Sequence, residues 1–593
     1  MSRVLVTTAI EETWPNGEPI LFLGEWCRRF SRRERWSRLD TKVVNYHWDN
    51  RSRLAADFRY LDGFHEKLLE DLASDLNELH GTDHSLRYWR ILIGPWLGYF
   101  VAILRDRWLS IEEAVDHHDI SWTRVLKFRE LDLVPRTFDD FSTLYVLDEW
   151  NHYIYSMVLE KFSQVDICRE ARHDLPFPTT VAVHPNNRVA VKTLLWQMSL
   201  RLFAQFVRKD DIVLFGTYLS FRKEVVLSLQ LHQSPVIWHL IPRPDLQVEA
   251  ARTHWTMSGT PTDIFEEFVR EMIPRQIPRA YSDGYCNLQT AVEEMLLPAN
   301  PRLIFTSNAH ISDDLFKAWA ALKVENGARL AIGQHGGCHG ALRHFFIEDH
   351  QLRISDAFLS WGWKDSANSR IKPVGQLIAR KHSRSVHAEQ ETALLVGNSD
   401  PRQSHHLYSC PISSQWLSWL EDQFKFVEAL PEHIRSALLV RLYREDYGWD
   451  QVKRWQDRCP DVRLDDAQGP STMADLLPQA RVMIATRNAT TFLESFTMDV
   501  PTIIFWNPNH WELRETATPV FESLIEAEIL HYSPISAANK LSNIWNDVDS
   551  WWSSEPVITA RKGFCDSHNQ SPPDLVSRVT QALKETIREP PRE

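Results

Sequence analysis

Short apolar runs that end in polar residues recur along the chain, and each predicts a β-strand. In the first 375 residues we expect such runs at residues 3–8, 19–27, 211–215, 236–240, 303–306, 329–333 and 356–363. Helical patterns lie between several of them. Strands that alternate with helices are typical of an α/β fold, in which helices cover both faces of a parallel sheet.

A second alternation of strands and helices follows a polar stretch at residues 380–390, which we interpret as a linker. It predicts strands at residues 393–396, 437–442, 462–464, 482–485 and 501–505, and helices at 473–477 and 492–498. We therefore expect two Rossmann-like domains, residues 1–375 and 376–565, with a cleft between them. Residues 566–593 are polar and contain prolines, which predicts a frayed tail.

The pattern inside the first domain turns helical at about residues 61–208, which we interpret as a helical insertion. Apolar residues recur there at three- and four-residue steps from Leu61 until Gly81, and further helices are expected at 110, 148–162 and 189–207. Residues 91–104 are strongly apolar but are shorter than the ~20 residues of a spanning helix. A buried helix is the favoured interpretation, with a shallow dip into lipid as the alternative.

The composition limits the kind of protein and its partners. A chain of 593 residues is too long for one core. The net charge of −13 and the absence of a long basic run argue against binding to nucleic acid, whereas an anionic small molecule needs only a local positive pocket. Seven scattered cysteines without a C-x-x-C pair, and an N-terminus unlike a signal peptide, indicate a cytoplasmic protein.

A glycine- and histidine-rich stretch, residues 333–363, stands at the centre of the predicted first domain. Gly336 and Gly337 indicate a sharp turn or a close approach of the backbone to a ligand, and His335 is then a candidate to face that ligand. His310 ends another predicted strand and is expected at the same sheet edge. A loop whose histidines are merely hydrogen-bonded remains the alternative for each of them.

The most specific stretch of the second half is residues 482–505, a strand, a polar turn, a helix and another strand. Asn488, Thr490 and Thr491 lie where a helix begins, and backbone N–H groups at that position bind phosphate oxygens. Arg487 adds a positive fork, and Glu494 is placed to accept ribose hydroxyls. Alternatively, Thr490 caps the helix and Glu494 complements its dipole.

Four motifs in this order resemble a bacterial family of transferases of about this length, the LIC12162 type, associated with surface-polysaccharide and O-antigen gene clusters. The motifs are TTAIEETW with PILFLGEWC, GQHGGCHG, ISDAFLSWGW and RNATTFLESFTMDVPTIIFW. The last one also resembles the nucleotide-sugar-binding half of GT-B glycosyltransferases. A weaker similarity links the chain to transferases of CMP-activated ulosonic acids such as Kdo.

This resemblance implies a glycosyltransferase of GT-B type that moves a sugar from a CMP- or NDP-linked donor to a glycan or lipid-linked acceptor. The protein would work in the cytoplasm, with peripheral contact to the inner membrane, in lipopolysaccharide O-antigen or capsule synthesis. Beyond the nucleotide sugar no cofactor or metal is implied. Donor binding falls to Asn398, Ser399, Arg441, Arg487, Asn488, Thr490, Thr491 and Glu494, and the catalytic candidates are Glu12, Glu25, His310 and His335.

Three other interpretations remain open. A non-catalytic protein that binds nucleotide sugars or carbohydrates would show the same motifs. A serine hydrolase lacks the G-x-S-x-G elbow. A metal-dependent hydrolase would need ligands from the histidine-rich loop, where His335, Cys338, His339 and His344 match no standard spacing. The pairs at 117–118 and 405–406 are interpreted as surface or helix histidines.

Overall fold

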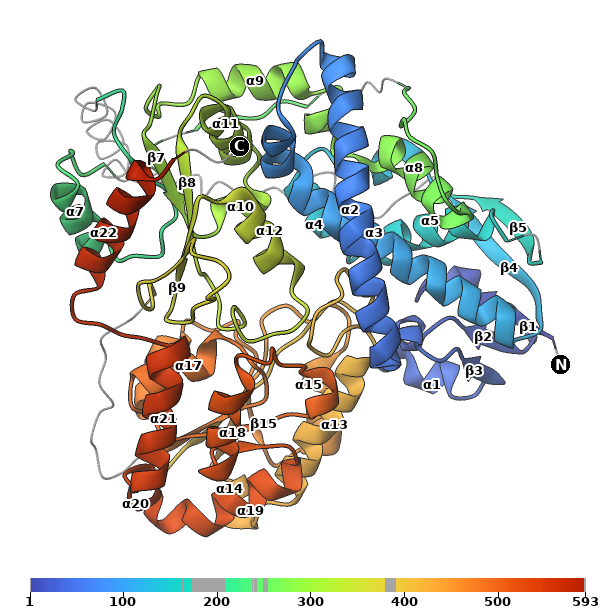
Figure 1. Ribbon diagram of the computed structural model, residues 1–593. Coiled ribbons are helices and arrows are strands. Elements are labelled where there is room, and N and C mark those ends of the chain that lie inside the picture. The colour runs from blue at the N-terminus through green and yellow to red at the C-terminus, as the bar shows by residue number, and fades with distance from the viewer. Residues whose placement is uncertain are drawn as a thin grey trace.

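The computed structural model describes residues 2–162, 164–172, 208–236, 238, 241, 243–248, 254–378 and 391–590 (Figure 1). In these parts of the chain the strands form three sheets, and every strand pair with a recorded register is parallel. Helices separate most of the strands in sequence and pack on the sheets. The predicted α/β class is therefore confirmed.

The first sheet has the order β3-β2-β1-β4-β5. Its strands are β1 (Arg3–Val6), β2 (Ile20–Phe22), β3 (Thr41–Val43), β4 (Ile120–Lys127) and β5 (Asp166–Ala171). Two long helices, α2 (Arg51–His80) and α3 (Leu86–His117), connect β3 to β4. The helical insertion predicted for 61–208 thus begins earlier and is interrupted by β4 and β5, which belong to the sheet.

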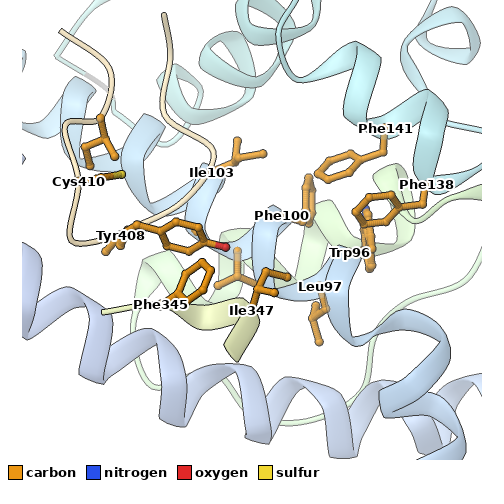
Figure 2. Close-up of a cluster of buried hydrophobic side chains, with 14 of the residues drawn as sticks. Trp96, Leu97, Phe100, Ile103, Phe138, Phe141, Phe345, Ile347, Tyr408 and Cys410 are labelled. Atoms are coloured by element: carbon orange, nitrogen blue, oxygen red, sulfur yellow. The ribbon is translucent and has the colours of Figure 1, made fainter. Parts of the chain in front are cut away.

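Helix α3 is the central core helix of this part of the protein. Its apolar stretch is buried, and Trp96 stacks on Phe100 with 5.1 Å between ring centroids (Figure 2). This confirms a buried helix at 91–104. In the described parts of the chain no helix is long and apolar enough to cross a membrane. The helix start expected at Ser110 is wrong, because α3 runs through it and the Ser110 hydroxyl donates to the Asp106 carbonyl. The helix expected at 189–207 lies outside the described residues.

The second sheet has the order β10-β9-β8-β7-β6. Its strands are β6 (Val213–Leu214), β7 (Leu303–Thr306), β8 (Arg329–Gly333), β9 (Ala357–Ser360) and β10 (Ile371–Pro373). Helix α11 (Asp314–Glu325) packs on one face, while α7 (Phe221–Gln230) and α22 (Leu575–Arg588) cover the other (Figure 1). Residues predicted to form one N-terminal domain therefore contribute to two separate sheets.

Two expectations for this region need correction. The tail after Asp566 is not frayed: α21 (Glu555–His568) continues through Asp566, and α22 buries Leu575, Val579 and Leu583 against the second sheet. The strand expected at 236–240 is not found at Val236, which is described and irregular, and most of that range lies outside the described residues.

The third sheet has the order β13-β12-β11-β14-β15-β16. Its strands are β11 (Ala393–Val396), β12 (Leu438–Arg441), β13 (Arg463–Asp465), β14 (Val482–Ala485), β15 (Thr502–Phe505) and β16 (Leu530–His531). All five strands predicted for the second half are present, and β16 is additional. The order reverses between β11 and β14, and ligands of such sheets bind where the strand order reverses.

Candidate active site

A cavity of about 260 Å³ opens at this reversal point of the third sheet. It is lined at the ends of three neighbouring strands and at the start of α17 (Thr490–Thr497). Four of the predicted donor-binding residues line it, namely Asn398, Arg441, Arg487 and Thr491. The structure thus brings residues from three distant sequence segments to one site.

Asp400 organises the β11 side of the cavity. Its carboxylate oxygen Oδ2 lies 3.2 Å from a guanidinium nitrogen of Arg487 and accepts a 2.9 Å hydrogen bond from the Asn398 amide. Burial works against the charge of Arg487, but the Asp400 carboxylate and the nearby Cys410, Cys338 and Tyr443 side chains together raise the pKa of the guanidinium above its ordinary value. Arg487 is therefore a fixed cation, held by one partner and open on the cavity side.

Two more arginines come from the end of β12. Arg441 is oriented by Asp465 and by a 2.8 Å hydrogen bond to the Ser471 carbonyl, whereas Arg444 is exposed and lines the cavity. Ser399, in contrast, is buried and donates to the Asp446 carbonyl at 3.3 Å. It supports the β11 loop but does not line the cavity.

The start of α17 supplies backbone donors. Ala489, Thr491 and Phe492 line the cavity, so the first N–H groups of the helix, which have no intrahelical partner, are close to it. Asn488 is fully buried, and among the residues that the structure describes neither of its side-chain polar atoms has a hydrogen-bond partner. Glu494 faces a separate crevice beside Thr497, so the structure does not bring it to the cavity.

The glycine- and histidine-rich loop of the second sheet rests on this helix start. The Gly337 N–H donates to the Thr490 hydroxyl at 3.1 Å, and the Cys338 thiol donates to the Asn488 carbonyl at 3.1 Å. A Cβ atom on Gly337 would lie 2.7 Å from the carbonyl carbon of Ala489. Only glycine permits this contact, which joins the second and third sheets at the site.

The two neighbouring glycines offer a matched test of this contact. Gly337→Ala is expected to lower the free energy of unfolding by about 1–3 kcal/mol, because the added methyl meets backbone atoms that cannot rotate away. Gly336→Ala is the control, since its Cβ would find no atom closer than 3.9 Å. Urea unfolding of both variants measures the difference, and equal stability would contradict the packing described here.

Three histidine side chains and one glutamine side chain meet behind this loop. The amide of Gln351, on α12 (Phe346–Ile354), lies 2.9 Å from Nε2 of His339, 3.0 Å from Nε2 of His310 and 3.2 Å from Nδ1 of His335. Burial lowers the pKa of His335 to about 3 and that of His339 to about 4. Burial also holds the pKa of His310 well below its ordinary value. All three rings are therefore neutral at pH 7.

Hydrogen bonding then places the protons on these rings. Nδ1 of His339 lies 3.1 Å from the Gly336 carbonyl, which can only accept, so the neutral ring carries its proton there and its Nε2 accepts. The Gln351 amide satisfies all three rings when its NH₂ group faces His339, an orientation reached by a half-turn of the amide. Its oxygen would then accept from His335 Nδ1, which leaves Nε2 of His335 with a lone pair.

The other two catalytic candidates lie elsewhere. Glu12 and Glu25 follow β1 and β2 of the first sheet, where Glu12 pairs with Arg172 at 3.3 Å and Glu25 pairs with Arg28. The structure brings His310 and His335 together but does not bring these carboxylates to them. His335 is the more accessible histidine, because His310 is only 1% exposed.

The crowded residues of the metal-site alternative have separate partners. His339 bonds Gln351, Cys338 bonds a carbonyl, and His344 packs its ring against Phe58. Among the described residues no group of three or more histidine, cysteine, aspartate or glutamate side chains is arranged to hold a metal ion. The geometry gives no support to a hydrolase built on these residues.

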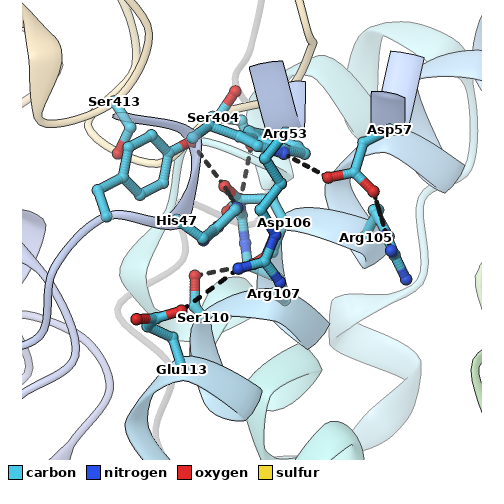
Figure 3. Close-up of polar contacts among 12 residues, drawn as sticks. His47, Arg53, Asp57, Arg105, Asp106, Arg107, Ser110, Glu113, Ser404 and Ser413 are labelled. Atoms are coloured by element: carbon cyan, nitrogen blue, oxygen red, sulfur yellow. Dashed lines mark hydrogen bonds and ion pairs between the residues drawn. The ribbon is translucent and has the colours of Figure 1, made fainter. Parts of the chain in front are cut away.

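A buried loop after β11, residues 397–414, anchors the cavity wall to the other two sheets. Arg107 of α3 donates to the Ser404 carbonyl at 2.8 Å, within the buried network shown in Figure 3. Arg402 pairs with Asp148 at 2.6 Å, and the Ser409 N–H donates to the His344 carbonyl. The interpretation of residues 405–406 as surface or helix histidines is wrong, since His406 lies buried in this loop.

Sequence reasoning missed several residues of the site. Asp400 and Arg444 end predicted strands, so their position alone could have identified them. Gln351 lies inside an ordinary helical pattern, and no sequence signal distinguishes it. Its role depends on three rings contributed by two other segments.

The family of the chain follows from a sequence profile. The profile of the LIC12162 family transferases matches residues 3–583, nearly the whole chain. This chain belongs to that family. No curated protein matches it significantly in sequence.

Solved structures that match part of this chain are distant from it in sequence, and their TM-scores are low. One is described as a UDP-N-acetylglucosamine 2-epimerase from Listeria monocytogenes (11% identity, TM-score 0.36, covering 65% of this chain and 99% of that one). Another is the wall teichoic acid polymerase TagF (10% identity, TM-score 0.30, covering 67% of this chain and 96% of that one). A third is WaaG, a glycosyltransferase involved in lipopolysaccharide biosynthesis (12% identity, TM-score 0.26, covering 50% of this chain and 81% of that one). The transferase family of this chain rests on the profile match.

Proposed function

We propose that this LIC12162 family member is a glycosyltransferase that uses a nucleotide-linked sugar donor. The observation that carries the proposal is the cavity at the reversal point of the third sheet, where three arginines and a helix start surround one space. Guanidinium groups and free backbone N–H groups are the donors that bind phosphate oxygens. The negative charge of the departing nucleotide would be stabilised by the same groups during transfer.

The proposal assigns the acceptor to the second sheet, whose glycine- and histidine-rich loop rests on the start of α17. The carboxyl ends of β6, β7 and β8 carry Tyr218, Asn308 and His335, and the Asn308 amide donates to the Tyr218 hydroxyl at 3.1 Å. Tyr218 has a positive φ of 64°, a strained conformation that is typical of functional sites. His335 Nε2 would take the proton from the attacking acceptor hydroxyl. The acceptor is a glycan or lipid-linked sugar of a surface polysaccharide such as O-antigen or capsule.

The donor site can be tested by ligand-dependent thermal stabilisation. We expect one of CMP, UDP, GDP, dTDP or CMP-Kdo to raise the unfolding temperature, because a ligand that binds only the folded state stabilises it. Arg444→Ala should weaken the binding of that nucleotide about 10- to 100-fold, which is the effect of losing one hydrogen bond to a charged group. Arg444 is exposed, so the fold should be unaffected.

Arg463→Ala is the matched control, because Arg463 is an exposed arginine on the adjacent strand β13, outside the cavity. It should leave the temperature shift unchanged. Failure of all five ligands to stabilise the wild type, or an equal loss in both variants, contradicts the proposed donor site. Stabilisation without any sugar transfer would instead favour a non-catalytic nucleotide-sugar-binding protein.

A further inference from the structure

A dense group of arginines follows β2, although the chain as a whole is acidic. Residues 28–38 hold six arginines and one glutamate, a formal charge of +5 in a chain whose net charge is −13. We call this group the arginine surface; it consists of Arg28, Arg29, Arg32, Arg33, Arg35 and Arg38. It spans a short 3-10 turn and α1 (Arg33–Trp36) beside the edge strand β3, near the N-terminus in Figure 1.

Only part of this positive charge is neutralised. Arg28, Arg33 and Arg35 form ion pairs with Glu25, Asp457 and Glu11, respectively. Arg32 lies 3.7 Å from Glu11 and its side chain is 66% exposed. Within the described parts of the chain, Arg29 and Arg38 have no ion pair, and both are exposed. Arg29 and Arg38 therefore carry unpaired charge that faces solvent, and the charge of exposed Arg32 is only partly balanced, because Glu11 also pairs with Arg35.

Aromatic rings hold the arginine surface in a fixed shape. The Phe30 ring contacts two guanidinium groups: its centroid lies 4.5 Å from Cζ of Arg33 and 4.3 Å from Cζ of Arg454. The Trp36 indole donates to the Arg29 carbonyl at 2.9 Å, and the Ser31 N–H donates to Asp450 at 2.8 Å. The segment is thus attached to the third sheet's α15 (Gln451–Arg458) region, so binding a partner would cost little ordering.

We propose that the arginine surface binds the headgroups of an anionic phospholipid bilayer. Arg29, Arg32 and Arg38 are exposed to solvent on a short turn and helix, which suits a flat anionic surface better than the concave pocket of a small-molecule site. A planar array of negative headgroups asks only for outward-facing cations, each contributing about 1 kcal/mol. Half-buried Trp36 is an indole ring of the kind found at the level of the headgroups. This inference is independent of the donor site.

Vesicle co-sedimentation tests the proposal with the full-length protein. Wild type should bind vesicles that contain phosphatidylglycerol but not vesicles of phosphatidylcholine, and added salt should weaken binding. The combined variant Arg29→Ala, Arg32→Ala and Arg38→Ala should bind about 100-fold more weakly, the sum of three such contributions. Its unfolding temperature should match that of wild type, because all three side chains are exposed.

A second triple variant controls for net charge. Lys209→Ala, Arg222→Ala and Lys364→Ala remove three exposed cations from other surfaces and should leave vesicle binding unchanged. Equal weakening in both triple variants overturns the proposal, as does equal binding of wild type to neutral vesicles. Binding of wild type to inorganic polyphosphate without binding to anionic vesicles also overturns it, in favour of a soluble polyanion. Nucleotide-dependent stabilisation, measured separately, does not depend on any of these outcomes.

Discussion

Lowering the pH from about 7.5 to about 5.5 is expected to reduce the protein's free energy of unfolding by several kcal/mol, because many of its histidines are buried in neutral form. Burial lowers the pKa of His335 to about 3 and that of His339 to about 4. It also holds the pKa of His310, His350 and His406 well below the ordinary value. An unfolded chain has no such burial, so its histidines titrate near pH 6.5.

The sign follows from which state binds more protons. Below about pH 6.5 the unfolded chain takes up protons that the folded protein cannot, so the free energy of unfolding falls as the pH falls. Each of these histidines contributes about 1.4 kcal/mol per pH unit in that range. Five of them remove about 7 kcal/mol by about pH 5.5. Asp349, whose pKa burial raises to about 7, offsets part of this loss, because the folded protein takes up that proton before the unfolded chain does.

Urea unfolding at several pH values measures this loss. The midpoint should fall steeply between about pH 6.5 and about pH 4, where the folded histidines begin to titrate. Carboxylates paired with arginines lose their contribution to stability over a different pH range. Arg51 holds the pKa of Glu512 below its ordinary value against the opposing effect of burial, so the stability from that pair is lost only at lower pH. A stability that is flat between pH 7 and pH 5 would contradict the buried neutral histidines.

The strands of the third sheet were predictable because each one is a short apolar run bounded by turn residues. Val482–Ala485 and Thr502–Phe505 are examples, buried along their whole length. Their polar ends were predictable for the same reason, since parallel strands place their carboxyl ends at one edge. Asn398, Arg441 and Arg487 were therefore predictable members of this edge, whereas Arg444 lines the same cavity and was not predicted.

Long-range packing explains what the sequence could not predict. Helix α22 is amphipathic, but nothing in its sequence says that it returns to cover a sheet more than 200 residues earlier. Likewise, Glu12 and Glu25 end strands as expected, yet they belong to a first sheet separate from that of His335. The loop at 397–414 contains many polar residues, yet it is buried. Arg107 of α3 donates to the Ser404 carbonyl in the loop, and Arg402 of the loop donates to the Asp148 carboxylate.

Burial of the histidine cluster underlies both the proposed role of His335 as a base and the expected loss of stability in acid. Gln351 orients three rings in a space that excludes much of the water, which both fixes the position of His335 and prevents the rings from charging. A base of lowered pKa stays unprotonated at neutral pH. The same burial that destabilises the protein in acid therefore keeps the His335 lone pair free at neutral pH, while a pKa of about 3 leaves the resting ring a weaker base than an ordinary histidine.

His335→Ala is expected to lower turnover about 100- to 10,000-fold, the range that general-base catalysis contributes. The nucleotide-dependent rise in unfolding temperature should remain, because the donor cavity is lined by other residues. Turnover is measured as nucleotide release from the matching sugar donor, with and without acceptor. His117→Ala, at the exposed end of α3, is the control and should be as active as wild type.

The two readouts of His335→Ala separate catalysis from structure. A loss of turnover with unchanged nucleotide binding means that the imidazole acts in the chemical step and not in holding the donor. A loss of both would mean that removing the ring disturbs the loop at Gly337 and the helix start beneath it. Full activity would exclude His335 as the base. His310, which Gln351 also contacts and which follows β7, would then be the next candidate for the base.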